Sequence, residues 1–254
     1  MKRVAIVGAA GRMGQVMAEG LGRESDLEVR ALIDVAPPAR SYDAIVATSL
    51  ESLEASSLDA VVDFSTPEGV LASAAWCAAH GVGLVVGTTG LSDAQRDQVA
   101  EAARTTRVVM APNFALGAVL AERFAVVAAP YFERVEVIEL HHDAKVDAPS
   151  GTSLSTARAL AAARRAAGRA EMAEPTQRHS VEGSRGADVE GVRVHAVRLP
   201  GLVAHEEILF GGPGEGLTIR HDSYDRRSFV QGVALALRKM GDAPGLSEGL
   251  GEFL

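Results

Sequence analysis

The polar residues of this sequence are most concentrated between positions 136 and 152, in the run EVIELHHDAKVDAPSGT. The run begins on an expected strand and ends where a helix is expected to start, so its end can present backbone N–H groups and hydroxyls to an anion. The residues at that end are Ser150, Gly151 and Thr152. Three side chains of the run can carry a positive charge or donate a proton as a cation: His141, His142 and Lys145. The run therefore predicts a site for an anionic substrate carrying carboxylates, with a His or Lys to supply the proton that a hydride addition needs.

A glycine-rich turn near the start of the chain is a variant of the dinucleotide-binding fingerprint, spaced G-x-x-G-x-x-G. It follows the apolar run at residues 3–7, leads at once into an expected helix, and consists of Gly8, Ala9, Ala10, Gly11, Arg12, Met13 and Gly14. Small residues let the backbone approach a pyrophosphate closely, and the helix N-terminus offers N–H donors to it. The turn predicts a dinucleotide site.

The residue that ends the second expected strand supports this interpretation. Asp34 follows the glycine turn by about the 20 residues that dinucleotide folds require. A carboxylate there binds the ribose hydroxyls and repels a 2′-phosphate, and Val35 after it is not basic. NADH is the expected cofactor. NADPH stays as the alternative, because Arg40 in the following loop can reach a phosphate.

Two further loops come directly after expected strands. One contains Gly87, Thr88 and Thr89, and the other contains Ala111, Pro112, Asn113 and Phe114. In an open α/β sheet the carboxyl ends of the strands face the ligand. Both loops are therefore expected to contact the nicotinamide half of the cofactor, although each taken alone could simply be a helix-capping turn.

Strands and helices alternate through the first half of the chain. Short apolar runs predict strands at 3–7, 29–33, 60–64, 82–86 and 107–110, and Ala-rich stretches predict helices at 13–21, 68–79 and 93–104. Such alternation predicts an α/β fold, a Rossmann-like doubly wound parallel sheet.

After residue 113 the pattern changes to a second, α+β domain with a mixed or antiparallel sheet. Helices are expected at 115–129, 153–167 and 226–239, a strand at 134–140, and antiparallel strands at 192–198, 206–210 and 216–220. Residues 168–191 are expected to form a long connection. The predicted division is a dinucleotide-binding domain at 1–113 and a substrate-binding domain at 114–223.

Composition narrows the classes of function. The chain has 254 residues, a net charge of −8 and 47% hydrophobic residues, which excludes intrinsic disorder and gives no basic surface for nucleic acid. Cys77 is the only cysteine, so no internal disulfide forms, and its helical context predicts a buried thiol. The chain has no uninterrupted apolar stretch of about 18 residues, so no membrane span is expected. A cytoplasmic location is predicted.

Five motifs in order, covering nearly the whole chain, resemble the 4-hydroxy-tetrahydrodipicolinate reductase (dihydrodipicolinate reductase) family. The family signature E-[IV]-x-E-x-H-x-x-x-K-x-D-x-P-S-G-T-A matches residues 136–153 except at its last position, where Ser153 replaces Ala. The other matches are the glycine turn at 8–14, VDFSTP at 62–67, GTTG at 87–90 and Asn113-Phe114. The resemblance implies NAD(P)H-dependent reduction in lysine and diaminopimelate biosynthesis.

The same resemblance implies roles for individual residues. His141 corresponds to the catalytic proton donor and Lys145 to a second catalytic cation, while His142, Gly151 and Thr152 correspond to the carboxylate site of a dicarboxylate substrate. The glycine turn, Asp34 and the two loops correspond to cofactor contacts. The resemblance also implies a homotetramer assembled through the second domain, with the C-terminal segment at 224–254 packed back on the first.

Other functions remain to be weighed. His141, His142 and Asp143 could suggest a metal site, but neighbouring residues of a strand point to opposite faces, so no metal is expected. A Schiff-base role for Lys145 fits poorly with a cofactor turn at the front of the chain. A non-catalytic redox sensor would keep Gly8, Gly11 and Asp34 but would not need His141 and Lys145. NADH oxidation in the presence of substrate separates a sensor from a reductase.

Overall fold

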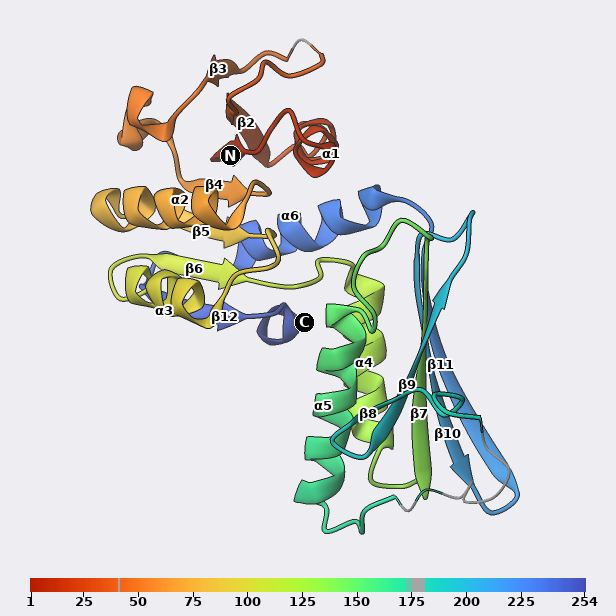
Figure 1. Ribbon diagram of the computed structural model, residues 1–254. Coiled ribbons are helices and arrows are strands. Elements are labelled where there is room, and N and C mark those ends of the chain that lie inside the picture. Colours follow the sequence, from red (N-terminus) through yellow and green to blue (C-terminus); the bar gives the residue numbers. More distant parts are fainter. Residues whose placement is uncertain (41, 173, 175–180) are drawn as a thin grey trace. The chain divides into compact units, whose positions relative to one another are not determined.

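A computed structural model of the chain describes residues 1–40, 42–172, 174 and 181–254 (Figure 1). The chain divides into two compact units. The first combines Met1–Leu116 with Arg226–Leu254, and the second is Gly117–Asp225. No helix in the described ranges has both the length and the apolar character needed to cross a bilayer.

The first unit is built on a seven-stranded sheet in which every pairing is parallel. In spatial order its strands are β12 (Gly245–Glu248), β6 (Arg107–Met110), β5 (Gly83–Val86), β4 (Ala60–Asp63), β1 (Lys2–Val7), β2 (Leu27–Ile33) and β3 (Ile45–Ala47). The strand order reverses between β1 and β4. This is the switch point at which doubly wound sheets bind their ligands, at the carboxyl ends of the strands.

Helices cover both faces of this sheet (Figure 1). They are α1 (Arg12–Leu21), α2 (Pro67–His80), α3 (Asp93–Ala102) and α6 (Val230–Lys239), with short 3₁₀ turns η1 (Leu50–Ser52), η2 (Ala55–Ser57), η3 (Arg226–Phe229) and η4 (Gly251–Phe253). Ala5, Val61 and Leu84 form a buried cluster with residues of α2 and α3. Alternate strand residues point the other way, where α1 and α6 pack on each other. The central strands β1, β4, β5 and β6 are thus buried on both sides, as their apolar runs predict.

The second unit has a five-stranded mixed sheet with two helices, α4 (Leu116–Ala128) and α5 (Gly151–Ala166), on one face (Figure 1). In spatial order the strands are β11 (Glu215–Ser223), β10 (Ala204–Gly212), β7 (Arg134–His141), β9 (Val192–Arg198) and β8 (Ala187–Val189). Val137, Ile208 and Leu160 belong to the cluster that joins the sheet to its helices. The predicted fold class, a Rossmann-like parallel sheet followed by an α+β unit, is confirmed.

The structure corrects one strand direction. Residues 192–198 were expected to be antiparallel, but β9 runs parallel to β7 and antiparallel only to the short β8. The physical reason is the connection: the chain crosses over through α5 between β7 and β9, and a crossover returns a strand in the same direction.

Three short strands were not predicted: β3, β8 and β12. Each has only three or four residues, with sequences IVA, ADV and GLSE, so neither length nor alternation distinguishes them from loop. β8 lies inside the expected connection at 168–191, of which residues 173 and 175–180 lie outside the described residues. A neighbouring strand supplies the pairing that their own sequences do not specify.

Candidate active site

A cavity of about 530 Å³ lies in the first unit at the carboxyl ends of β1, β2 and β4. The residues from the predicted cofactor set that line it are Gly8, Gly11 and Asp34. Phe64, Ser65 and Trp76 line it as well. The cavity therefore lies at the switch point, and the glycine turn and the strand-end carboxylate share it.

The glycine turn needs its small residues. Gly8 has a φ of +79°, and a Cβ there would lie 2.4 Å from the carbonyl oxygen of Phe64. A Cβ on Gly14 would lie 2.1 Å from the carbonyl oxygen of Gly8, so α1 can approach the turn only with glycine there. Gly11 is the N-cap of α1 and provides no side-chain cap, which leaves first-turn N–H groups available to a pyrophosphate. These features fit a bound dinucleotide.

Asp34 follows β2 directly and is tied to the glycine turn. Its Oδ2 accepts a hydrogen bond from the Ala10 N–H at 2.9 Å, and its Oδ1 accepts one from the Ala36 N–H at 3.1 Å. A carboxylate has further lone pairs, so it can still accept hydrogen bonds from ribose hydroxyls. Arg40 forms an ion pair with Glu19 of α1 at 3.1 Å, which engages the cation that could have met a 2′-phosphate.

A buried carboxylate at the end of β4 organises the neighbouring loops. Asp63 is fully buried and accepts hydrogen bonds from the hydroxyls of Ser65 (2.7 Å), Ser73 (2.6 Å) and Thr88 (2.9 Å). Asp63 thereby joins the loop after β4, helix α2 and the loop after β5. Sequence reasoning quoted Asp63 within a motif but gave it no role; its signal was a lone carboxylate ending an apolar strand.

The two predicted nicotinamide-side loops follow β5 and β6, at the same sheet edge as the glycine turn. None of their residues lines the cavity itself. Phe114 is buried, and its ring meets the Phe64 ring edge-on, with centroids 6.0 Å apart. Ala111 is also buried, so this loop can offer a ligand mainly its backbone and the more exposed Pro112 and Asn113.

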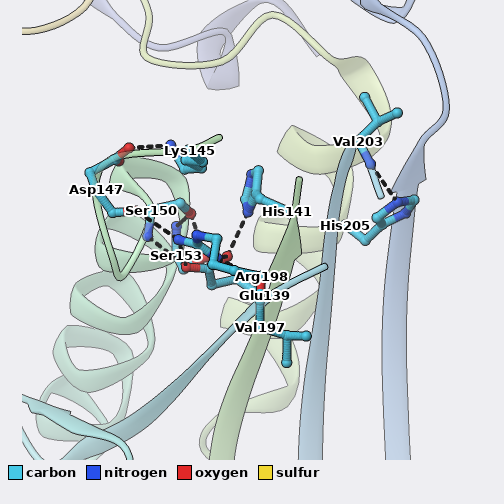
Figure 2. Close-up of polar contacts among 10 residues, drawn as sticks. All are labelled: Glu139, His141, Lys145, Asp147, Ser150, Ser153, Val197, Arg198, Val203 and His205. Carbon is cyan, nitrogen blue, oxygen red and sulfur yellow. Dashed lines mark hydrogen bonds and ion pairs between the residues drawn. The ribbon is translucent and has the colours of Figure 1, made fainter. Parts of the chain in front are cut away.

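In the second unit, His141 ends β7 beside a buried carboxylate. Its Nδ1 lies 2.5 Å from Oε2 of Glu139, which is fully buried (Figure 2). Burial alone would raise the pKa of Glu139, but hydrogen bonds from His141 and Arg198 outweigh it and lower that pKa to about 2. Glu139 is therefore ionised at neutral pH.

Lys145 lies in the loop that leaves β7. Its Nζ donates to Asp147 Oδ1 at 2.6 Å, and this hydrogen bond is the main reason that the pKa of Asp147 is lowered (Figure 2). The loop also folds back on itself, because the Lys145 N–H donates to the carbonyl oxygen of His142 at 3.2 Å. The ammonium group is thus held, and its side chain is only 21% exposed.

The start of α5 closes the same end of the sheet. Ser150 is the N-cap and accepts from the Ser153 N–H at 3.2 Å, while its own N–H donates to Glu139 Oε1 at 3.0 Å. Gly151 and Thr152 form the first turn of the helix. The structure therefore brings together His141, Lys145 and Ser150, which come from a strand end, a loop and a helix start (Figure 2).

Sequence reasoning missed Arg198. This residue ends β9, and its guanidinium binds both oxygens of Glu139 at 2.7 Å and the carbonyl oxygen of Asp147 at 2.7 Å. No motif signals it, since its partners are distant in sequence. His205, by contrast, accepts from the Val203 N–H at 3.2 Å and pairs with Asp222 at 2.6 Å, so both ring nitrogens are engaged.

Two other predicted features can be placed. Cys77 lies fully buried in α2, where a buried thiol was predicted. Burial raises the pKa of this thiol. Across the described part of the chain, no three His, Cys, Asp or Glu side chains gather in a way that could hold a metal ion.

A parallel sheet that carries a glycine turn and a strand-end carboxylate at its switch point is typical of NAD(P)H-dependent oxidoreductases. Family models described as dihydrodipicolinate reductase, N-terminus and dihydrodipicolinate reductase, C-terminus match residues 2–114 and 115–254. The chain belongs to the dihydrodipicolinate reductase family. The family predicted from the five motifs is confirmed.

Close relatives agree with this assignment. A 4-hydroxy-tetrahydrodipicolinate reductase of Nocardia farcinica is 48% identical over 255 residues, covering 99% of this chain and 98% of the relative. One from Bifidobacterium animalis subsp. lactis is also 48% identical, over 264 residues, covering 100% of this chain and 99% of the relative. The solved structure of a dipicolinate-bound dihydrodipicolinate reductase from Paenisporosarcina sp. TG-14 matches with a TM-score of 0.88 at 40% identity, covering all of both chains.

Proposed function

We propose that this protein catalyses the NAD(P)H-dependent reduction of 4-hydroxy-tetrahydrodipicolinate to tetrahydrodipicolinate, in which the substrate takes up a hydride and a proton and its hydroxyl group leaves as water, a step of lysine and diaminopimelate biosynthesis. One arrangement carries the proposal: His141, Lys145 and the start of α5 converge at the end of β7 in a chain of this family. The dicarboxylate found in the Paenisporosarcina relative is the type of ligand that such a cationic site would take.

The first unit would hold the cofactor. When bound, the reduced nicotinamide supplies the hydride. First-turn N–H groups of α1 would bind the pyrophosphate and Asp34 the ribose, with residues 8–13, 87–89 and 111–114 forming the surrounding contacts. NADH would be favoured over NADPH because Asp34 repels a 2′-phosphate and Arg40 is already paired with Glu19.

The second unit would hold the substrate. Its carboxylates would be met by donors from His142 and from the first turn of α5, Gly151 and Thr152, while Ser150 holds the start of that helix on Glu139. His141 would supply the proton that balances the added hydride, and Lys145 would stabilise the charge that develops on the substrate. Assembly as a homotetramer and a cytoplasmic location remain predictions.

A steady-state assay tests the function directly. The substrate is generated enzymatically in the cuvette, and oxidation of NADH or NADPH is followed by absorbance. We expect substrate-dependent oxidation, with a lower KM for NADH than for NADPH. Binding of NADH without any substrate-dependent oxidation would overturn the proposal and favour a non-catalytic redox sensor.

A further inference from the structure

Two networks of the same composition lie on strand β7. Glu139 contacts His141 and Arg198, whereas Glu136 contacts His195 and Arg185. The two glutamates are three residues apart, so their side chains leave opposite faces of the strand. Of the two networks, only that of Glu139 reaches residues of the proposed substrate site. The Glu136 network therefore serves as a structural reference for the effects of the Glu139 network.

Glu139 receives more hydrogen bonds than an ordinary structural ion pair needs. Its Oε2 is bound by His141 Nδ1 at 2.5 Å and by Arg198 Nη1 at 2.7 Å. Its Oε1 is bound by Arg198 Nη2 at 2.7 Å and by the Ser150 N–H at 3.0 Å. A fully buried, ionised carboxylate can only accept hydrogen bonds, and these four donors compensate it.

This arrangement determines which nitrogen of His141 exchanges protons. Because Glu139 is an acceptor only, Nδ1 must carry a hydrogen, and Nε2 is left as the ring atom that can give up or take a proton. A buried carboxylate that accepts from one ring nitrogen in this way fixes the tautomer and the orientation of the imidazole.

The same carboxylate is connected to Lys145. Arg198 binds Glu139 through Nη1 and Nη2, and its Nη2 also donates to the carbonyl oxygen of Asp147 at 2.7 Å. The Asp147 carboxylate in turn holds Lys145 Nζ at 2.6 Å. One strand end, one loop and the α5 N-cap are therefore tied to a single buried anion (Figure 2).

We propose that Glu139 is a positioning residue of this enzyme: it fixes His141 with Nε2 as its proton-exchanging atom and, through Arg198, holds the loop that carries Lys145. This inference rests on the proposed reductase function. Neither Glu139 nor Arg198 needs to touch the substrate. Both act through His141 and Lys145, the groups proposed to contact it.

A double-mutant cycle tests the proposal. In the otherwise unchanged enzyme, Glu139→Gln should lower kcat by about 10²-fold while the Kd for NADH stays unchanged, because His141 loses its orienting acceptor. In a His141→Gln background the same change should cost less than about tenfold, since only its hold on the Lys145 loop through Arg198 is then left to lose. Equal losses in both backgrounds would overturn the proposal.

A matched control comes from the second network. Glu136→Gln removes a carboxylate with a His and an Arg partner from the same strand, so it reports the cost of breaking such a network in this sheet. We expect its kcat to stay within about twofold of the parent. A loss equal to that of Glu139→Gln would show that Glu139 has only a structural role.

Two further measurements keep the proposal testable if Glu139→Gln folds poorly. Arg198→Lys keeps the charge but loses the two-pronged contact, and we expect a loss of kcat that shrinks in a Lys145→Met background. Long-range ¹H–¹⁵N spectra of ¹⁵N-histidine-labelled protein, assigned with His141→Gln, should show Nδ1 of His141 protonated. A neutral His141 with its proton on Nε2 would contradict the inference whether or not the enzyme turns over.

The assay of the parent protein tests the reductase function, whereas the variants and the spectra test the positioning role of Glu139. A parent protein that does not reduce the substrate refutes the proposed function. An active parent whose Glu139→Gln variant keeps its kcat refutes only the positioning role.

Discussion

Glu206 of β10 lies directly opposite Glu139 of β7 in the antiparallel register, and both carboxylates are buried toward α5. Glu206 accepts a hydrogen bond from the Thr156 hydroxyl at 3.1 Å, whereas its other oxygen has no partner. Burial is the main cause that raises the pKa of Glu206 to about 7, and the negative charges of Glu122 and Glu139 add to it. Two neighbouring carboxylates thus differ in charge near neutral pH.

This contrast predicts a pH dependence of stability. Between its ordinary pKa of 4.5 and about 7, Glu206 is protonated in the folded chain and ionised in the unfolded one. Its contribution to stability is therefore complete below pH 4.5 and is lost as the pH rises through 7, a change of about 3 kcal/mol at most. The lowered pKa of Glu139 acts in a separate window, because that contribution is lost only as the pH falls from 4.5 toward 2.

Urea unfolding at a series of pH values between 5 and 8 measures the Glu206 effect. Glu206→Gln should flatten the fall in the free energy of unfolding across this range and should be more stable than the parent at pH 8. Glu207→Gln is the control, since Glu207 faces the other side of β10 and pairs with the exposed Arg220. A parent-like slope in Glu206→Gln would refute the prediction.

The cofactor preference can be tested at Asp34. Asp34→Ser removes the charge that repels a 2′-phosphate, so the ratio of the NADPH and NADH KM values should move toward one. If Glu19→Gln releases Arg40 from its ion pair, Arg40 is expected to bind the 2′-phosphate and to lower the KM for NADPH. Equal use of both cofactors by the parent enzyme would count against a dominant role for Asp34.

The roles proposed for His141 and Lys145 in proton transfer predict that replacing either residue slows the chemical step. Lys145→Met and His141→Gln should each lower kcat by about 10²–10⁴-fold, the range of general acid catalysis, with NADH affinity by fluorescence unchanged. The two losses should be less than additive because both residues serve one event. Retention of most of the kcat by Lys145→Met would make that lysine a surface charge.

The hydrogen bonds of Asp63 predict that replacing this residue weakens cofactor binding and does not act on the chemical step directly. Asp63→Ala leaves the buried Ser73 hydroxyl without its acceptor and releases Ser65 and Thr88, so we expect a stability loss of about 1–3 kcal/mol and weaker NADH binding. Asp59→Ala at the other end of β4 removes a half-exposed ion pair with Arg3 and should leave the Kd for NADH unchanged. Equal Kd values for the two variants would show that Asp63 does not organise the cofactor loops.

The sequence predicted those parts of the molecule that depend on local pattern. Apolar runs such as 107–110 became strands at the same residues, and the glycine turn and Asp34 met at one cavity. The signature at 136–153 placed His141 and Lys145 on a strand end and the following loop.

What could not be predicted depends on long-range pairing. The direction of β9 follows from a crossover, and β12 is a strand only because β6 lies beside it. Arg198 is invisible in the sequence because its partners Glu139 and Asp147 are reached only when β9 lies beside β7. Short strands and buried ion-pair networks are decided by the tertiary structure, not by local propensity.

The parallel sheet of the first unit is completed from the far end of the chain. β12 forms its outer edge on β6, and α6 fits so closely that a Cβ on Gly232 would lie 1.9 Å from the carbonyl oxygen of Phe114. During synthesis, β1 to β6 therefore leave the ribosome long before their last neighbour, and β6 has an open edge until residues 245–248 arrive. Folding of this unit can be completed only after the whole second unit has been translated, which makes the interval a period of exposure to aggregation and a point where chaperones can act.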